Sequence, residues 1–292
     1  MKKTLIALAA VAVTSTAMAQ VTISGNLAYG FAGDTTNAGV STNGFGTDTA
    51  NLTFAASEDL GGGLSFKGSL SFENFQEDAA LAGTGTNLTL SGGFGSVNMS
   101  SDESGDYLPI DGLTSQGNGT IADRITYTAP AFNGLTLSVT RGDDVGVIDS
   151  DVGNTVGKQT VVSATYVTGP LTLNVMSLDV GGAYETTVAG RTYAKVSYDL
   201  GVASVSYGMI KSDLATDSTQ TGLSVTVPMG AMSFTAAHAT SKVDGGTSYS
   251  GNALSASYAL SKRTSIALYN ESYESTSTSN VKEYSLLLTH SF

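Results

Sequence analysis

Residues 21–31 read VTISGNLAYGF, and their side chains alternate between apolar and polar. Val21 and Ile23 fall on one face of this alternation, and Thr22 and Asn26 fall on the opposite face. A period of two predicts a β-strand with one apolar and one polar face. The opening of this segment therefore favours an all-β fold whose sheet separates two different environments.

The same alternation recurs along the rest of the chain, as in GLTLSVT (134–140) and ALSASYAL (253–260). Every second connection is a tight turn, and the others are longer and polar, such as 34–47, 102–120 and 142–157. Short turns at one end, long loops at the other and an even strand number are typical of an outer-membrane barrel. We predict sixteen strands, at residues 21–33, 48–58, 63–75, 85–92, 94–101, 121–129, 134–141, 158–168, 170–179, 190–199, 202–212, 218–228, 230–242, 248–260, 262–274 and 280–292.

The first nineteen residues, MKKTLIALAAVAVTSTAMA, combine two lysines, an apolar stretch and a small-residue end. This pattern predicts a secretory signal peptide over 1–19 and a single mature domain over 20–292. Loss of Lys2 and Lys3 leaves 11 basic against 25 acidic residues, a net charge of −14, which argues against a nucleic-acid partner. No run of about 18 apolar residues follows, so a mature chain that crossed a membrane would have to close into a barrel.

The polar face of the predicted strands is rich in Ser, Thr and Asn, and the apolar face carries Ala, Val and Leu. We expect the apolar face to point outward, because about sixteen strands enclose a lumen too wide for side chains to fill. Four tyrosines come just before short turns, which predicts an aromatic girdle at a membrane interface. They are Tyr127, Tyr166, Tyr198 and Tyr258.

Several strings resemble the general porins of Gram-negative bacteria, namely SEDLGGGLSFKGSLSFEN (57–74), ITYTAPAFNGLTLSV (125–139) and YALSKRTSIALY (258–269). The resemblance implies a homotrimer of sixteen-stranded antiparallel transmembrane β-barrels with short periplasmic turns and longer extracellular loops. It also implies an inward-folded third loop that narrows a water-filled pore for small hydrophilic solutes and ions. Its location would be the outer membrane, in contact with the lipid bilayer and lipopolysaccharide and without a cofactor.

The third long loop is interpreted as the constriction loop because of its place in the strand order. It carries four carboxylates, Asp102, Glu103, Asp106 and Asp111. By alternation, the basic residues that face the lumen are Lys67, Arg124, Arg191 and Lys195. Other wall positions where the family commonly has basic residues are neutral here, including Asn51, Ala55 and Thr126. An excess of carboxylates at a narrow neck attracts cations, so we predict weak cation selectivity.

Catalysis is not expected, because the two histidines, His238 and His290, lie in no G-x-S-x-G or zinc-ligand pattern. DSDVGN (149–154) is similar to a calcium loop but lacks its terminal glutamate, so Ca²⁺ at the acidic loops is a weaker alternative. A sugar-selective channel also stays open, with Tyr193 and Tyr269 as lumen aromatics. So does a non-conducting structural barrel.

The sequence ends in EYSLLLTHSF (283–292), which alternates like a strand except at Leu287. We expect this strand to pair with the first one, because barrel closure leaves no open edge. Phe292 would stand on the outward face at the height of the tyrosine girdle. A terminal aromatic residue also resembles the signal by which such barrels are recognised for assembly.

Overall fold

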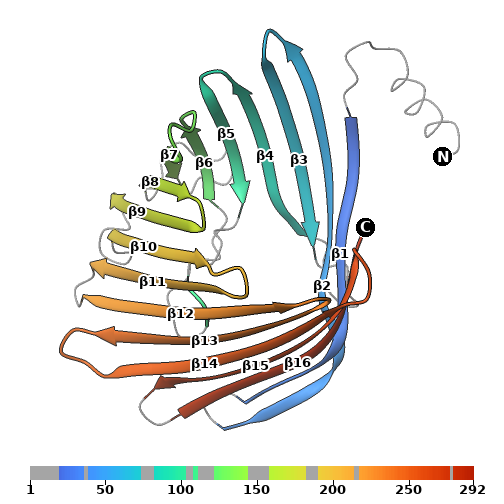
Figure 1. The fold of residues 1–292 in the computed structure, drawn as a ribbon, viewed down its shortest axis with the longest axis vertical. Coiled ribbons are helices and arrows are strands. Elements are labelled where there is room, and N and C mark those ends of the chain that lie inside the picture. Colours follow the sequence, from blue (N-terminus) through green and yellow to red (C-terminus); the bar gives the residue numbers. More distant parts are fainter. Residues whose placement is uncertain are drawn as a thin grey trace, which may run out of the picture.

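The computed structural model describes residues 20–35, 39–73, 82–102, 108–110, 122–143, 158–181, 190–213, 217–276 and 279–292, which form one closed barrel (Figure 1). The region expected to be a signal peptide, 1–19, lies outside these residues. The described part of the chain contains no helix long and apolar enough to cross a membrane. The strands are β1 (Gln20–Thr35), β2 (Ser41–Gly61), β3 (Leu64–Glu73), β4 (Ala82–Gly92), β5 (Gly95–Asp102), β6 (Ala122–Thr128), β7 (Leu135–Asp143), β8 (Lys158–Thr168), β9 (Leu171–Gly181), β10 (Gly190–Asp199), β11 (Ser204–Asp213), β12 (Ser218–Met229), β13 (Met232–Val243), β14 (Ser248–Ala259), β15 (Thr264–Thr276) and β16 (Ser279–Ser291).

The sixteen predicted strands are confirmed, and each pairs in antiparallel fashion with its neighbours in sequence. The prediction of a long polar loop over 34–47 is wrong, because β1 and β2 continue as a ribbon and pair up to Thr35 and Ser41. The rings of Phe31 and Phe45 hold this ribbon together in an edge-to-face contact with centroids 5.0 Å apart. Cross-strand aromatic pairs of this kind stabilise β-ribbons.

The two faces of the barrel have the predicted polarity. Leucine, valine and tyrosine side chains stand exposed on the outer wall, including all four girdle tyrosines. Hydroxyl and amide side chains form cross-strand hydrogen bonds on the inner wall, where they satisfy one another in the absence of an apolar core. These pairs include Thr53–Ser71 at 3.0 Å, Thr126–Thr140 at 2.8 Å, Ser138–Ser163 at 2.6 Å, Ser206–Ser224 at 2.7 Å and Thr226–Thr235 at 2.9 Å.

The barrel closes where β1 meets β16, drawn blue and red in Figure 1. Gly25 and Phe292 exchange both backbone hydrogen bonds, each with an N···O distance of 3.1 Å. The Phe292 ring covers Gly25 so closely that a Cβ there would stand 2.5 Å from its Cζ. Tyr284 covers Gly33 in the same way, with its Cζ 2.5 Å from the position of a Cβ. Phe292, for which a role in closure is predicted, is thus bonded through its backbone to β1 at this seam.

Candidate functional site

Residues 108–110, the described part of the connection between β5 and β6, lie in the lumen against the inner wall, and we call them the loop tip. Leu108 is only 5% exposed and packs with Tyr193 of β10 and Ile210 of β11. Both wall residues are themselves buried by this contact, at 7% and 2% exposure. The expectation that the third loop folds inward is therefore confirmed for its tip.

Ile110 makes the second contact of the tip. Its side chain is 4% exposed and packs with Ala239 of β13 and Ala253 of β14, flanked by Tyr249 and Tyr273. Its φ of 72° lies in the left-handed region, which a β-branched residue rarely adopts. Such a conformation persists where the surrounding contacts over-determine it. The tip is therefore held on the wall by packing.

Glycines on the wall make room for the tip between these two contacts. A Cβ at Gly208 of β11 would stand 2.6 Å from Cδ2 of Leu108. A Cβ at Gly222 of β12 would stand 2.6 Å from Cδ of Pro109. Together with the two alanines on β13 and β14, these glycines form a shallow track of small residues, which we call the docking track (Gly208, Gly222, Ala239 and Ala253).

The predicted acidic residues of the loop are mostly not placed. Asp102 ends β5 and pairs through its backbone with Gly85 and Ala122. Glu103, Asp106 and Asp111 lie outside the described residues, as does the segment 149–154 that was compared with a calcium loop. Their part in the constriction stays a prediction.

The four basic residues have the register of the inner wall. Lys67 lies on the same face of β3 as Ser71, and Arg124 lies on the same face of β6 as Thr126. Ser71 and Thr126 both belong to the hydrogen-bonded pairs of the inner wall. Arg191 and Lys195 flank the lumen residue Tyr193 on β10. Because Tyr193 contacts Leu108, the tip of the loop lies beside these two basic residues and does not face them across the lumen.

A group of wall carboxylates was missed by the sequence analysis. Asp34 of β1, Asp48 of β2 and Glu283 of β16 line one lumen-side cavity of about 510 Å³, together with Tyr269 of β15. The Tyr269 hydroxyl donates a hydrogen bond to the buried Glu271. We call the three cavity carboxylates the acidic pocket. Alternation within the first and last strands, combined with barrel closure, was the signal that would have found Asp34 and Glu283, whereas Asp48 lies at the register shift of β2.

The acidic pocket and the basic residues of β10 lie on opposite sides of the lumen. In the closed order of sixteen strands, β10 is eight strands from β2 in either direction. Arg191 and Lys195 therefore face the wall that carries Asp48 and its neighbours. The arrangement produces an electric field across the pore, perpendicular to the path of a solute.

No other chemistry stands out among the described residues, which include no group of three or more His, Cys, Asp or Glu that could hold a metal ion. Nδ1 of His238 lies 3.0 Å from the Asn252 side-chain oxygen. Nδ1 of His290 lies 2.9 Å from the Thr264 hydroxyl, close to the short-turn end of the seam. Both contacts are those of structural residues.

A family model described as Gram-negative porin matches residues 4–278. The chain belongs to this family. Its similarity to outer membrane porin protein 32 of Delftia acidovorans is 32% identity over 252 residues, which covers 70% of this chain and 68% of that porin. The family and this relative establish an outer-membrane porin, and they point to a channel and not an enzyme.

Solved structures show the same barrel. The anion-selective porin from Comamonas acidovorans superimposes with a TM-score of 0.78 at 20% identity, over 94% of this chain and all of the other. A loop-deletion mutant of OmpT, an outer membrane protein of Vibrio cholerae, gives a TM-score of 0.67 at 12% identity, over 94% of this chain and 99% of the other. At these identities the likeness extends to the fold alone.

Proposed function

We propose that this porin is a general diffusion pore that passes small hydrophilic solutes passively and weakly prefers cations. The observation that carries the cation preference is the acidic pocket, because its lining includes Asp34, Asp48 and Glu283 but no lysine or arginine. In this proposal residues 1–19 are removed on export, the mature barrels form homotrimers, and no cofactor takes part.

The described lumen wall carries more negative than positive charges. Seven carboxylates have an inward register or line the lumen cavity, Asp34, Asp48, Asp59, Glu73, Asp199, Glu271 and Glu283. Four basic residues have the same inward register, as described above. The loop carboxylates Asp102, Glu103, Asp106 and Asp111 would add to the negative side. A net negative neck raises the local cation concentration and repels anions.

Neutralising the acidic pocket should remove the cation preference. In Asp34→Asn/Asp48→Asn/Glu283→Gln, three negative charges disappear while the wall keeps its four basic residues. We expect the reversal potential in a tenfold KCl gradient to fall to near zero. Asp244→Asn, in the loop after β13, is the matched control and should leave the potential unchanged. A wild-type pore that already prefers anions would contradict the proposal.

Anion selectivity is the second candidate. It is favoured by the inward register of Arg124, Arg191 and Lys195, and by the similarity of the barrel to the anion-selective porin from Comamonas acidovorans. The two candidates predict different reversal potentials for Lys195→Gln and for the acidic-pocket variant. If the basic wall controls permeation, Lys195→Gln should shift the reversal potential more than the acidic-pocket variant does, and most strongly at low ionic strength.

The sugar-selective and non-conducting alternatives have less support. Tyr193 is covered by the loop tip, so one of the two proposed stacking residues is withdrawn from solutes. Tyr269 remains exposed to the lumen, with its hydroxyl bonded to Glu271. A large ohmic single-channel step without block by sugars would support the general pore, and an absence of steps would favour a structural barrel.

A further inference from the structure

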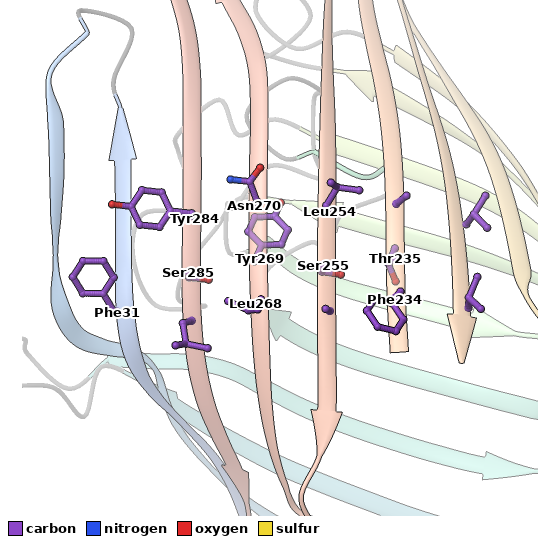
Figure 2. Close-up of a pocket in the computed structure, with 15 residues that line it drawn as sticks. Phe31, Phe234, Thr235, Leu254, Ser255, Leu268, Tyr269, Asn270, Tyr284 and Ser285 are labelled. Atoms are coloured by element: carbon purple, nitrogen blue, oxygen red, sulfur yellow. The ribbon is translucent and has the colours of Figure 1, made fainter. Parts of the chain in front are cut away.

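Tyr269 of β15 presents its ring to the lumen at the acidic pocket. Its neighbours across the sheet are Ser255 of β14 and Ser285 of β16, which both have small side chains (Figure 2). The tyrosine is 37% exposed and lines the cavity together with the three carboxylates. Since neither serine is large enough to cover the ring, one of its faces stays open to a passing solute.

The hydroxyl of Tyr269 fixes the direction of the ring. It donates a hydrogen bond to Glu271, the next inward residue of the same strand, whose side chain is only 2% exposed. Breaking a hydrogen bond to a buried polar group is costly. The ring is therefore held along β15 and does not swing freely into the lumen.

The carboxylates stand one step along the strands from the ring. Glu283 pairs with Glu271 on one side and with Asp34 on the other, so these three side chains share one level of the inner wall. Tyr269 pairs with Ser285, two residues from Glu283 on β16. Diagonal neighbours of this kind lie about 7–8 Å apart, within reach of aromatic and long side chains. A cation in the pocket therefore has access to the ring and to a carboxylate at the same time.

Small residues form the floor of the pocket at the level of the ring. From Tyr269 the paired residues run through Ser285 to Ala32 of β1 and Gly44 of β2. All of them line the cavity of about 510 Å³, and no atom lies within 4 Å of the position of a Cβ at Gly44. The space beside the ring is therefore open to an ammonium ion with organic substituents.

We propose that Tyr269 determines which cations this pore favours, and that it selects organic ammonium ions over alkali metal ions. The proposal rests on the cation preference proposed above. A ring face attracts cations, most strongly when they are desolvated, and quaternary ammonium groups are recognised in this way. A K⁺ ion that keeps its hydration shell gains only the attraction of the carboxylates.

The pocket favours an ammonium ion over a neutral sugar. A sugar would stack on the ring of Tyr269 and gain no Coulomb attraction from Asp34, Asp48 or Glu283. An ammonium ion with methyl or benzyl substituents uses the ring and the charges together. The lining of the pocket includes no lysine or arginine that would repel it.

Block of the K⁺ current by benzyltrimethylammonium, recorded on single pores of the full-length protein, tests the proposal. Tyr269→Leu should raise the half-blocking concentration by roughly two- to fivefold, as expected for the loss of one cation–π contact at a partly exposed ring. Tyr269→Gln, which keeps a donor for Glu271 but no ring, should do the same, and Tyr269→Phe should keep most of the block. Tyr207→Leu is the matched control and should be blocked as the wild type is, because Tyr207 pairs with Val196 and Leu223 on the outer wall.

Two further measurements separate this inference from the cation preference itself. The reversal potential in a KCl gradient should be the same in Tyr269→Leu as in the wild type, because no charge changes. An anion-preferring wild-type pore would contradict the cation preference, whereas unchanged block of both ringless variants in a cation-preferring pore would overturn only the role of the ring. Benzyl alcohol, the neutral probe, should leave the K⁺ current unaltered. If it blocked as well as the ammonium ion and lost its effect in Tyr269→Leu, the ring would bind aromatic solutes irrespective of charge, and the proposal would be wrong.

Discussion

Deletion of Phe292 should reduce the amount of folded barrel in the outer membrane by roughly tenfold or more. The deletion removes the two backbone hydrogen bonds with Gly25, at about 1 kcal/mol each, and the ring that covers this glycine. A loss of about 2–3 kcal/mol at the closing seam corresponds to a factor of roughly 30 to 150 in the closed population. The heat-modifiable, folded band in outer-membrane fractions measures this directly.

Two control variants test whether the effect of the deletion comes from the closing seam or from the loss of an aromatic side chain in general. Phe292→Tyr keeps the ring and the backbone pair, so it should assemble as the wild type does. Phe132 stands 73% exposed in the short turn between β6 and β7, and Phe132→Ala should also leave assembly intact. Wild-type levels of folded protein after deletion of Phe292 would show that the seam does not depend on it. Conductance of the molecules that do assemble should be unaltered.

The strands were predictable because the two environments of a barrel wall impose the same alternation on every crossing. The start of β2 could not be predicted, because STNGFGTD (41–48) lacks regular alternation. Its pairing with β1 depends on the contact between Phe31 and Phe45. Leu287 had no explanation in the sequence. Its register places it on the inner wall opposite Gly30. A Cβ at Gly30 would stand 1.9 Å from the Leu286 carbonyl oxygen, so the glycine allows the backbones of β1 and β16 to approach closely there.

The functional site was predictable in outline only. The apolar triplet LPI (108–110) within a polar loop was a signal for docking, and it has matching small residues on the lumen face of four successive strands. Recognising that match requires the register between strands far apart in sequence. The acidic pocket required the same information, because Asp34 and Glu283 become neighbours only when the barrel closes.

The second large effect is expected on single-channel conductance in the double variant Gly208→Leu/Gly222→Leu, which alters the wall under the loop tip. At both glycines a Cβ would stand 2.6 Å from a tip atom, so the added side chains must displace Leu108 and Pro109 from the docking track. A displaced tip moves into the lumen, and we expect single-channel conductance to fall by roughly half, because a pore conducts in proportion to its open section. Open-channel noise should rise as the tip loses its fixed position.

Gly46→Leu is the matched control, since Gly46 pairs with Gly30 on β1 and has no atom within 4 Å of the position of its Cβ. It adds one leucine to the lumen wall without touching the tip. Because the chain contains no cysteine, Ile110→Cys/Ala253→Cys can lock the tip with a single disulfide. The locked pore should conduct as the wild type does, because the tip already rests there. Wild-type conductance in the double glycine variant, or a changed conductance after locking, would show that the tip does not define the open section of the pore.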